Sequence, residues 1–267
     1  MGARCVGKPL IGKALAFWAV QFQVGPRDMN EFSSNPSTRI RRTAQYGPVT
    51  IALSVVFGVV FLVESYVDGG GLWQISASTL GKLGGNAPVL TFGEGQWWRL
   101  VTAALMHGGL LHIAFNTYAN LIIGSAIEKT LGPGWVLGPF VFSAITGSLL
   151  SAYANPANVV AIGASGGIFG LVAMAAAISY LAPRLVGFSR SVLVQWLVFA
   201  LAIGVVAGFD NWGHVGGIVG GAICALVVAL FKRQPVWVRK VGWVGAALGA
   251  LVMAGSVAMA AQHYLAL

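Results

Sequence analysis

The stretch 161-AIGASGGIFG-170 places one serine, Ser165, among four glycines in a chain that is otherwise largely apolar. Glycines spaced along a membrane helix allow a neighbouring helix to approach closely. A serine in such a helix usually serves packing, so its hydroxyl does not by itself indicate chemistry. Whether Ser165 packs or reacts depends on whether this segment crosses a membrane and on which polar groups lie at the same depth.

The composition indicates a membrane protein. Of 267 residues, 57% are hydrophobic and only 9% are charged, whereas soluble domains carry roughly 25% charged residues. The net charge of +9 does not indicate nucleic-acid binding, because the basic residues do not alternate with exposed polar or aromatic residues on a soluble face. The two cysteines, Cys5 and Cys224, fall in a polar tail and an apolar run, which fits neither a disulfide framework nor a metal site.

Seven apolar segments approach the length of about 20 residues that a helix needs to cross a bilayer. The sequence therefore predicts an all-α, polytopic membrane protein. Residues 1–46 are polar and basic, with a Ser/Asn/Pro cluster, and predict a flexible tail. Residues 47–231 hold a six-helix core, and residues 232–267 hold a linker and one further membrane helix. The predicted spans are 48–67, 110–127, 134–153, 165–182, 191–208, 213–231 and 241–261.

The lysines and arginines predict the orientation of these spans. With the tail in the cytoplasm, only Lys82 and Arg99 lie on the opposite side, so 14 of the 16 basic residues are cytoplasmic. This bias matches the positive-inside rule. We expect a multi-pass protein of a bacterial plasma membrane with a cytoplasmic N-terminus.

The connection between the first two spans, about residues 68–109, lies outside and is rich in glycine and aromatic residues. Trp97 and Trp98 suit a membrane interface, where amphipathic rings are favoured. Two interpretations remain open for this segment: a simple aromatic anchor, or a structured loop partly embedded in the outer leaflet.

Four polar residues lie at one depth in this topology. The second, fourth and sixth spans all begin at the outer face, and they carry His112, Asn116, Ser165 and His214 near their starts. Buried polar groups without partners cost several kcal/mol in lipid. The four side chains are therefore expected to face one another or a water-filled cavity.

Ser165 and His214 suit nucleophilic catalysis, because a neutral imidazole within hydrogen-bond reach can remove the proton of a serine hydroxyl. The pair can meet only if their helices approach closely. Glycines four residues apart on both spans would permit this approach, and those on the sixth span share a face with His214. These glycines are Gly166, Gly170, Gly217 and Gly221.

Acyl transfer also needs donors for the oxyanion. Ser165 begins a predicted helix, where backbone N–H groups lack intrahelical partners, and His112 and Asn116 share one helix face. His107 is expected to support the preceding loop. A metal site of His107, His112 and His214 is disfavoured, because no carboxylate or cysteine joins them at ligand spacing. Asp210 could orient His214, but we interpret it as a loop residue.

With these residues assembled, the chain resembles the rhomboid family of intramembrane serine proteases over roughly residues 48–231. The segments 163-GASG-166, 112-HIAFN-116 and 214-HVGGIVGG-221 are similar to the G-x-S-G, H-x-x-x-N and H-x-x-G-x-x-x-G motifs of that family, in the same order. Trp98-Arg99 resembles its W-R motif in the first outer loop, His107 with His112 resembles its paired histidines, and 127-IEKTLG-132 resembles the turn after its second helix.

The resemblance implies a rhomboid-like six-helix core with a C-terminal seventh helix and a catalytic dyad. Ser165 would be the nucleophile and His214 the general base and acid, with Asn116, His112 and the Ser165 amide at the oxyanion. Supporting positions would be Phe169, Gly163, Gly166, Gly217, Gly221, Trp98, Arg99 and His107.

The resemblance also implies the partners and one departure. Substrates would be single-pass membrane proteins cut near the outer end of their helix, in contact with membrane lipid, without nucleic acid, metal or cofactor. Phe169 stands where some members have tyrosine, which leaves the orientation of His214 to packing. Phe115 and Trp196 fall where a lateral substrate gate would be.

Two alternative functions remain open. A non-catalytic rhomboid-like protein would bind membrane segments, but inactive relatives typically lack the serine or the histidine. A transporter would be expected to carry an intramembrane carboxylate, and the only candidate within a predicted span is Glu64.

Overall fold

The computed structural model describes residues 46–185 and 189–267, and it confirms the all-α class. Within these residues, six helices are long and apolar enough to cross a membrane, and a seventh, α7, is shorter. The predicted tail of residues 1–46 lies outside the described part except for its last residue. The seven helices are α2 (Pro48–Val67), α5 (Leu110–Leu131), α6 (Gly134–Ala154), α7 (Ser165–Leu181), α8 (Arg190–Ala207), α9 (Asn211–Leu230) and α10 (Pro235–Leu265).

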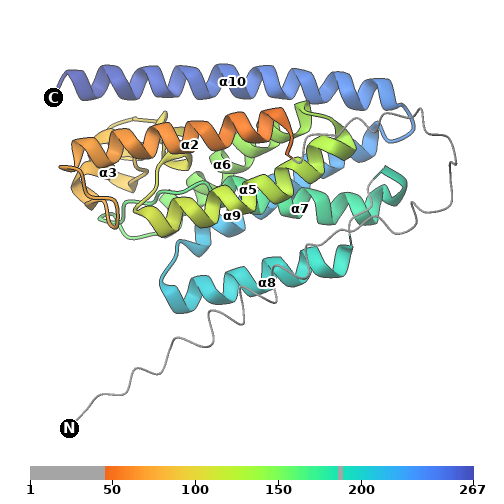
Figure 1. Cartoon of the computed structure of the whole chain (residues 1–267), viewed down its shortest axis with the longest axis horizontal. Helices are drawn as coiled ribbons and strands as arrows, with labels where there is room; N and C mark the ends of the chain where they lie inside the picture. Colours follow the sequence, from red (N-terminus) through yellow and green to blue (C-terminus); the bar gives the residue numbers. More distant parts are fainter. Residues whose placement is uncertain (1–45, 186–188) are drawn as a thin grey trace, which may run out of the picture. The chain divides into compact units, whose positions relative to one another are not determined.

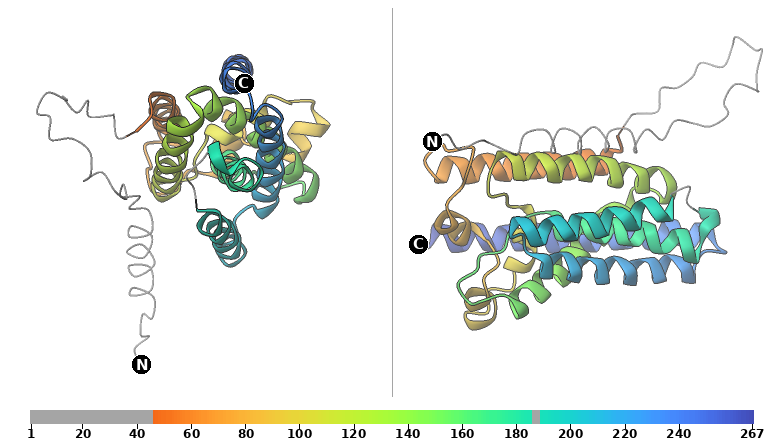
Figure 2. Two further views of the ribbon diagram at one scale, coloured as in Figure 1. Left: turned by 90° about the vertical axis from the view of Figure 1, so that its right-hand side faces the viewer. Right: turned by 90° about the horizontal axis from the view of Figure 1, so that it is seen from below.

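Helix α7 is the centre of the bundle. It contacts α5, α6, α8 and α9, and the view along the helices shows it enclosed by its neighbours (Figure 2). A helix that is apolar all round lies in a protein core or in lipid, and most of α7 is buried within the protein. Its 17 residues would reach about 26 Å, so α7 is shorter than the 20-residue helices α2 and α9.

The helices α7 and α9 pack backbone against backbone. A Cβ atom at Gly217 would overlap the carbonyl group of Gly166, and one at Gly221 would overlap that of Gly170. The same faces receive α6, where a Cβ at Gly147 would lie 2.6 Å from the Gly213 carbonyl oxygen. The expected close approach of these two spans is therefore present, and only glycine fits its contact positions.

Helix α5 extends to Leu131, four residues beyond the predicted span of about 110–127. The extra turn contains Glu128, whose carboxylate accepts hydrogen bonds from the Val49 and Thr50 amides at 3.0 Å and from Thr50 Oγ1 at 2.8 Å. Glu128 thus satisfies the free N–H groups at the start of α2. Glu64 is therefore not the only carboxylate within a span.

Helix α10 begins at Pro235 rather than near residue 241, so most of the predicted linker is helical. Proline is favoured in the first helical turn because its missing N–H has no intrahelical partner there. The helix packs on α6, where Trp135 Nε1 donates a 2.8 Å hydrogen bond to the Val238 carbonyl. Figure 1 shows α10 on one side of the bundle and α8 on the other.

The connection between α2 and α5 is a structured loop, not merely an aromatic anchor. It contains α3 (Ala77–Leu83), a π-helical turn (Val89–Gly93), α4 (Arg99–Thr102) and a 3-10 turn (Ala103–Leu105).

Arg99 is fully buried at the centre of this loop. Its guanidinium donates to the carbonyls of Gly81 at 2.6 Å and Gly85 at 2.9 Å, and to Gln96 Oε1 at 2.6 Å. The Arg99 guanidinium also lies over the Trp98 ring, 4.5 Å from its centroid. Trp98 is buried, whereas its neighbour Trp97 is 53% exposed.

Candidate active site

Ser165 and His214 meet at the glycine contact between α7 and α9. Ser165 is the first residue of α7, and His214 lies in the first turn of α9. The Ser165 Oγ atom lies 2.9 Å from His214 Nε2, within the range for nucleophile and base. The His214 side chain is buried, with 5% of its surface exposed.

Phe169 covers one face of the His214 ring. The two rings are stacked, with centroids 4.1 Å apart and planes 4° apart. Phe169 lies one turn after Ser165 on α7, so a single helix presents both the hydroxyl and the ring that packs on the imidazole. Packing thus holds the ring in its plane, as expected for a phenyl group in this position.

Asn211 contacts the other nitrogen of the imidazole and is absent from the sequence-based site. Its Oδ1 atom lies 3.1 Å from His214 Nδ1. The signal in the sequence was its position three residues before His214, which puts both side chains on one helix face. Asp210, in contrast, caps α9 by accepting from the Gly213 amide at 3.1 Å and from Asn155 Nδ2 at 2.9 Å.

His112 and Asn116 lie beside the turn that leads into Ser165. Gly163 has a φ of +119°, and a Cβ there would be 2.7 Å from His112 Nε2 and 3.8 Å from Asn116 Nδ2. This left-handed conformation and the missing side chain let the turn pass close to both donors. The Gly163 amide donates to the Ala103 carbonyl at 2.8 Å, which ties the turn to the loop between α2 and α5.

The hydrogen bonds of His112 determine which of its nitrogens is a donor. The Gly108 amide donates to His112 Nδ1 at 3.3 Å, so this nitrogen carries a lone pair. The proton of a neutral imidazole is then on Nε2, which faces Gly163. His112 and Asn116 therefore offer two N–H donors beside the nucleophile.

His107 lies beneath this site and is completely buried. Its backbone amide donates to the Glu64 carboxylate at 3.1 Å, and its ring centroid lies 5.2 Å from that of His112 and 5.4 Å from that of Phe57. Burial lowers the pKa of His107 to about 3, so the ring is neutral. Glu64 thus helps to hold the loop between α2 and α5 in place.

The two residues predicted for a lateral gate lie on different helices. Phe115, on α5, is 56% exposed, and Trp196, on α8, packs partly buried against the core. A gate formed by these rings stays a prediction.

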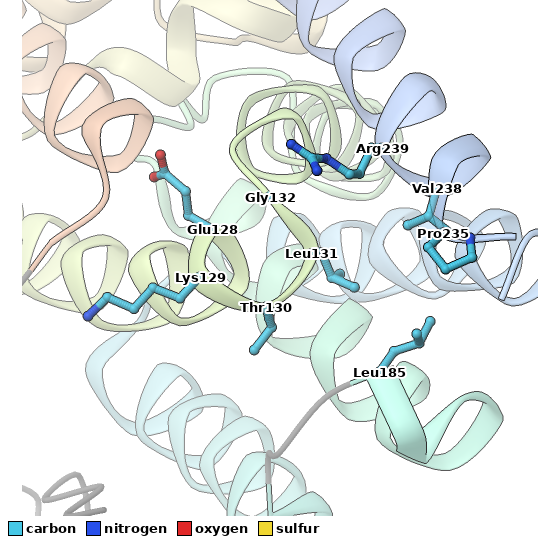
Figure 3. A pocket seen from close by; sticks show the side chains of 9 residues that line it. All are labelled: Glu128, Lys129, Thr130, Leu131, Gly132, Leu185, Pro235, Val238 and Arg239. Atoms are coloured by element: carbon cyan, nitrogen blue, oxygen red, sulfur yellow. The ribbon is translucent and has the colours of Figure 1, made fainter. Parts of the chain in front are cut away.

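A hollow lies at the other end of the bundle from Ser165. This cavity of about 310 Å³ lies between the end of α5 and the start of α10, and Figure 3 shows the side chains that line it, with Glu128, Lys129 and Arg239 among them. Because His112 is near the start of α5, the cavity is separated from the Ser165–His214 pair by roughly the length of that helix. Its lining includes Glu128, Lys129, Leu131, Leu185, Val238 and Arg239.

Known proteins share the segment that forms the site. Residues 94–231, just over half of the chain, match the family model described as the Rhomboid domain. The chain is 34% identical over 187 residues to the rhomboid protease GluP of Bacillus subtilis, an alignment that covers 68% of this chain and 34% of that protein. It is 29% identical over 213 residues to rhomboid-like protease 1 of Toxoplasma gondii, covering 77% of this chain and 71% of that one. The chain thus spans about a third of the length of the Bacillus protein and most of the Toxoplasma protein.

Proposed function

This chain belongs to the rhomboid family, and on that premise we propose that it is an intramembrane serine endopeptidase that works through a Ser165–His214 dyad. The observation that carries the proposal is the 2.9 Å contact between Ser165 Oγ and His214 Nε2. The names of its relatives support protease activity in general, and the geometry of these two residues supports the assignment of roles.

The reaction begins with attack on a peptide bond. Ser165 Oγ bonds to the carbonyl carbon while its proton passes to His214 Nε2, and the carbonyl oxygen takes the negative charge. The Ser165 amide at the helix start, His112 Nε2–H and the Asn116 amide are the proposed donors to that oxygen. Such donors act most strongly where they are already oriented and shielded from water.

The intermediate then collapses to products. The imidazolium of His214 returns the proton to the departing amine, the C–N bond breaks, and the acyl group remains on Ser165. A water molecule next attacks the acyl carbon while His214 takes its proton. The acyl C–O bond then breaks as the His214 imidazolium returns this proton to Ser165 Oγ, which releases the carboxylic acid and restores the hydroxyl.

The proposed substrates are membrane proteins, because the site lies within a bundle of membrane helices. The resemblance to the rhomboid family implies that these are single-pass proteins. The distribution of basic residues supports a cytoplasmic N-terminus and a site that opens to the outer side of the membrane. We also propose that residues 47–231 are the catalytic core, with α10 as an addition to it.

A serine-reactive fluorophosphonate tests this function. The folded wild-type chain in lipid should be labelled, and Ser165→Ala should lose the label. Absence of labelling in the folded wild-type chain would favour a non-catalytic protein that binds membrane segments.

A further inference from the structure

We propose that Asn211 is a positioning residue that sets which nitrogen of His214 carries the proton, and that α8 controls Asn211 through the backbone carbonyl of Leu201. This inference rests on the proposed function, because it concerns the same dyad. It adds Asn211 and helix α8 to the groups that control the base.

The Leu201 carbonyl determines the orientation of the Asn211 amide. Its Nδ2 atom donates a 3.2 Å hydrogen bond to the Leu201 carbonyl oxygen. A carbonyl oxygen can only accept, so the amide nitrogen must face Leu201 and the amide oxygen must face His214. The reversed amide would place two oxygens against each other and leave Nδ2 facing His214.

The orientation of the Asn211 amide in turn determines the tautomer of His214. Asn211 Oδ1 only accepts hydrogen bonds, and it lies 3.1 Å from His214 Nδ1, so Nδ1 carries the proton. The lone pair is then on Nε2, which accepts from the Ser165 hydroxyl. With the amide reversed, Nδ2 would donate to Nδ1, the proton would move to Nε2, and the base would be lost.

Helix α8 packs closely against the Asn211 side chain. Gly204 on α8 lies against the Asn211 side chain, and a Cβ at this glycine would overlap the amide oxygen. The turn between the helices is short, and the Phe209 amide donates to the Gly204 carbonyl at 2.8 Å. A displacement of the end of α8 is therefore transmitted to the start of α9.

Helix α8 is suited to move, because it is held by few buried side chains. Only Leu193, Leu197 and Gly204 are buried among its 18 residues, and Figure 1 shows it at the side of the bundle. An outward shift of α8 would remove the Leu201 carbonyl from Asn211 and free the amide to reverse. The position of α8 thus sets whether His214 can act as a base.

The first experiment compares Asn211→Leu, which is similar in size but cannot accept, with Asn211→Asp, which keeps the acceptor. The matched control is Asn158→Leu at an exposed loop position. The kinetic constants kcat and KM are measured on a model transmembrane substrate, using purified folded protein in lipid. Asn211→Leu should lower kcat about 10- to 100-fold, a fraction of the general-base effect, with KM changed less than about 3-fold.

Asn211→Asp should recover at least about a tenth of the wild-type kcat, because its carboxylate oxygen still accepts from His214 Nδ1–H. Its negative charge beside the ring favours the protonated base, so the acidic limb of the pH profile should move to higher pH. The other charged or titratable groups that act on His214 are Asp210 at the start of α9 and His112 on α5, and both are unchanged in these variants. This shift follows from the added charge itself, so the role of Asn211 is judged by the recovery of kcat in Asn211→Asp relative to Asn211→Leu.

The second experiment tests the link to α8. Gly204→Ala should lower kcat about 10-fold by pushing the Asn211 amide, whereas Gly58→Ala, at a helix position with nothing within 4 Å, should leave kcat unchanged. Wild-type kcat for folded Gly204→Ala would overturn the control by α8.

Ser165→Ala in the same assay separates the two proposals. If Ser165→Ala cleaves as well as the wild type, the proposed function fails. If Ser165→Ala is inactive while Asn211→Leu keeps the wild-type kcat and pH profile, only the role of Asn211 is overturned.

Discussion

Phe169 and His214 stack face to face, with their ring centroids 4.1 Å apart. This contact leaves the Nε2 edge of the imidazole pointing at Ser165 Oγ. The stack involves only the ring, so a hydroxyl on Phe169 is not needed to hold the histidine in plane.

We predict that Phe169→Tyr keeps kcat within about 3-fold of the wild type, whereas Phe169→Leu lowers it about 10-fold. Loss of the ring pair costs about 0.5–1.5 kcal/mol and frees the imidazole to tilt. The measurement is kcat of folded protein in lipid. Phe61→Leu, at another buried phenylalanine on α2, is the control for lost core volume and should leave kcat unchanged. Equal effects of the two leucine variants would contradict a role for stacking.

The donors proposed for the oxyanion can be tested on one helix. We predict that Asn116→Ala and His112→Ala each lower kcat about 100-fold, the cost of removing one such donor. Asn120→Ala is the matched control, because Asn120 lies one turn further along α5 and donates to the Thr50 carbonyl at 3.1 Å. It should lower thermal stability without lowering kcat of the folded fraction. Full activity of Asn116→Ala would remove that residue from the site.

Close approach of α7 and α9 should be required for both stability and activity. We predict that Gly217→Ala destabilises the fold by about 1–3 kcal/mol through overpacking and lowers activity at least about 10-fold. Unfolding is followed by circular dichroism in detergent and cleavage is measured in lipid. Gly255→Ala on α10, where a Cβ meets nothing within 4 Å, should be neutral in both assays. A neutral Gly217→Ala would show that the contact can relax without cost.

Arg99 should be a structural residue of the loop between α2 and α5. We predict that Arg99→Met destabilises the protein by about 2–4 kcal/mol, because two carbonyls and Gln96 lose a charged donor in a buried position. Lys82→Met is the control, since Lys82 is exposed on the same loop and should change the melting temperature little. An unchanged melting temperature in Arg99→Met would contradict this role.

The sequence predicted the spans well because the length and apolarity of a segment determine whether it can cross a bilayer. It could not predict the start of α10, because Arg239 and Lys240 are typical of a polar linker. In the structure, the helix already begins at Pro235. It also could not separate Trp97 from Trp98, since both suit an interface. Trp98 packs against Arg99, whose carbonyl partners are 14 and 18 residues away in the chain.

The candidate site was predictable where spacing along one helix carried the information, as for His112 with Asn116 and for His214 with its glycines. Asn211 was missed because its position at a helix start resembles that of an ordinary polar turn residue. Its contact with His214 is local, but its orientation depends on the Leu201 carbonyl on another helix. The end of α8 could not be placed against α9 from sequence alone.

The most direct measurement is cleavage of a single-pass model substrate in liposomes by the wild-type chain, Ser165→Ala and His214→Ala. Ser179→Ala is the matched control, because Ser179 also lies on α7 and donates to the Ala176 carbonyl at 2.6 Å. We predict that the wild type and Ser179→Ala cleave at similar rates, and that Ser165→Ala and His214→Ala, although folded and inserted, show no cleavage above background. Cleavage at the wild-type rate by either folded dyad variant would contradict the proposed mechanism.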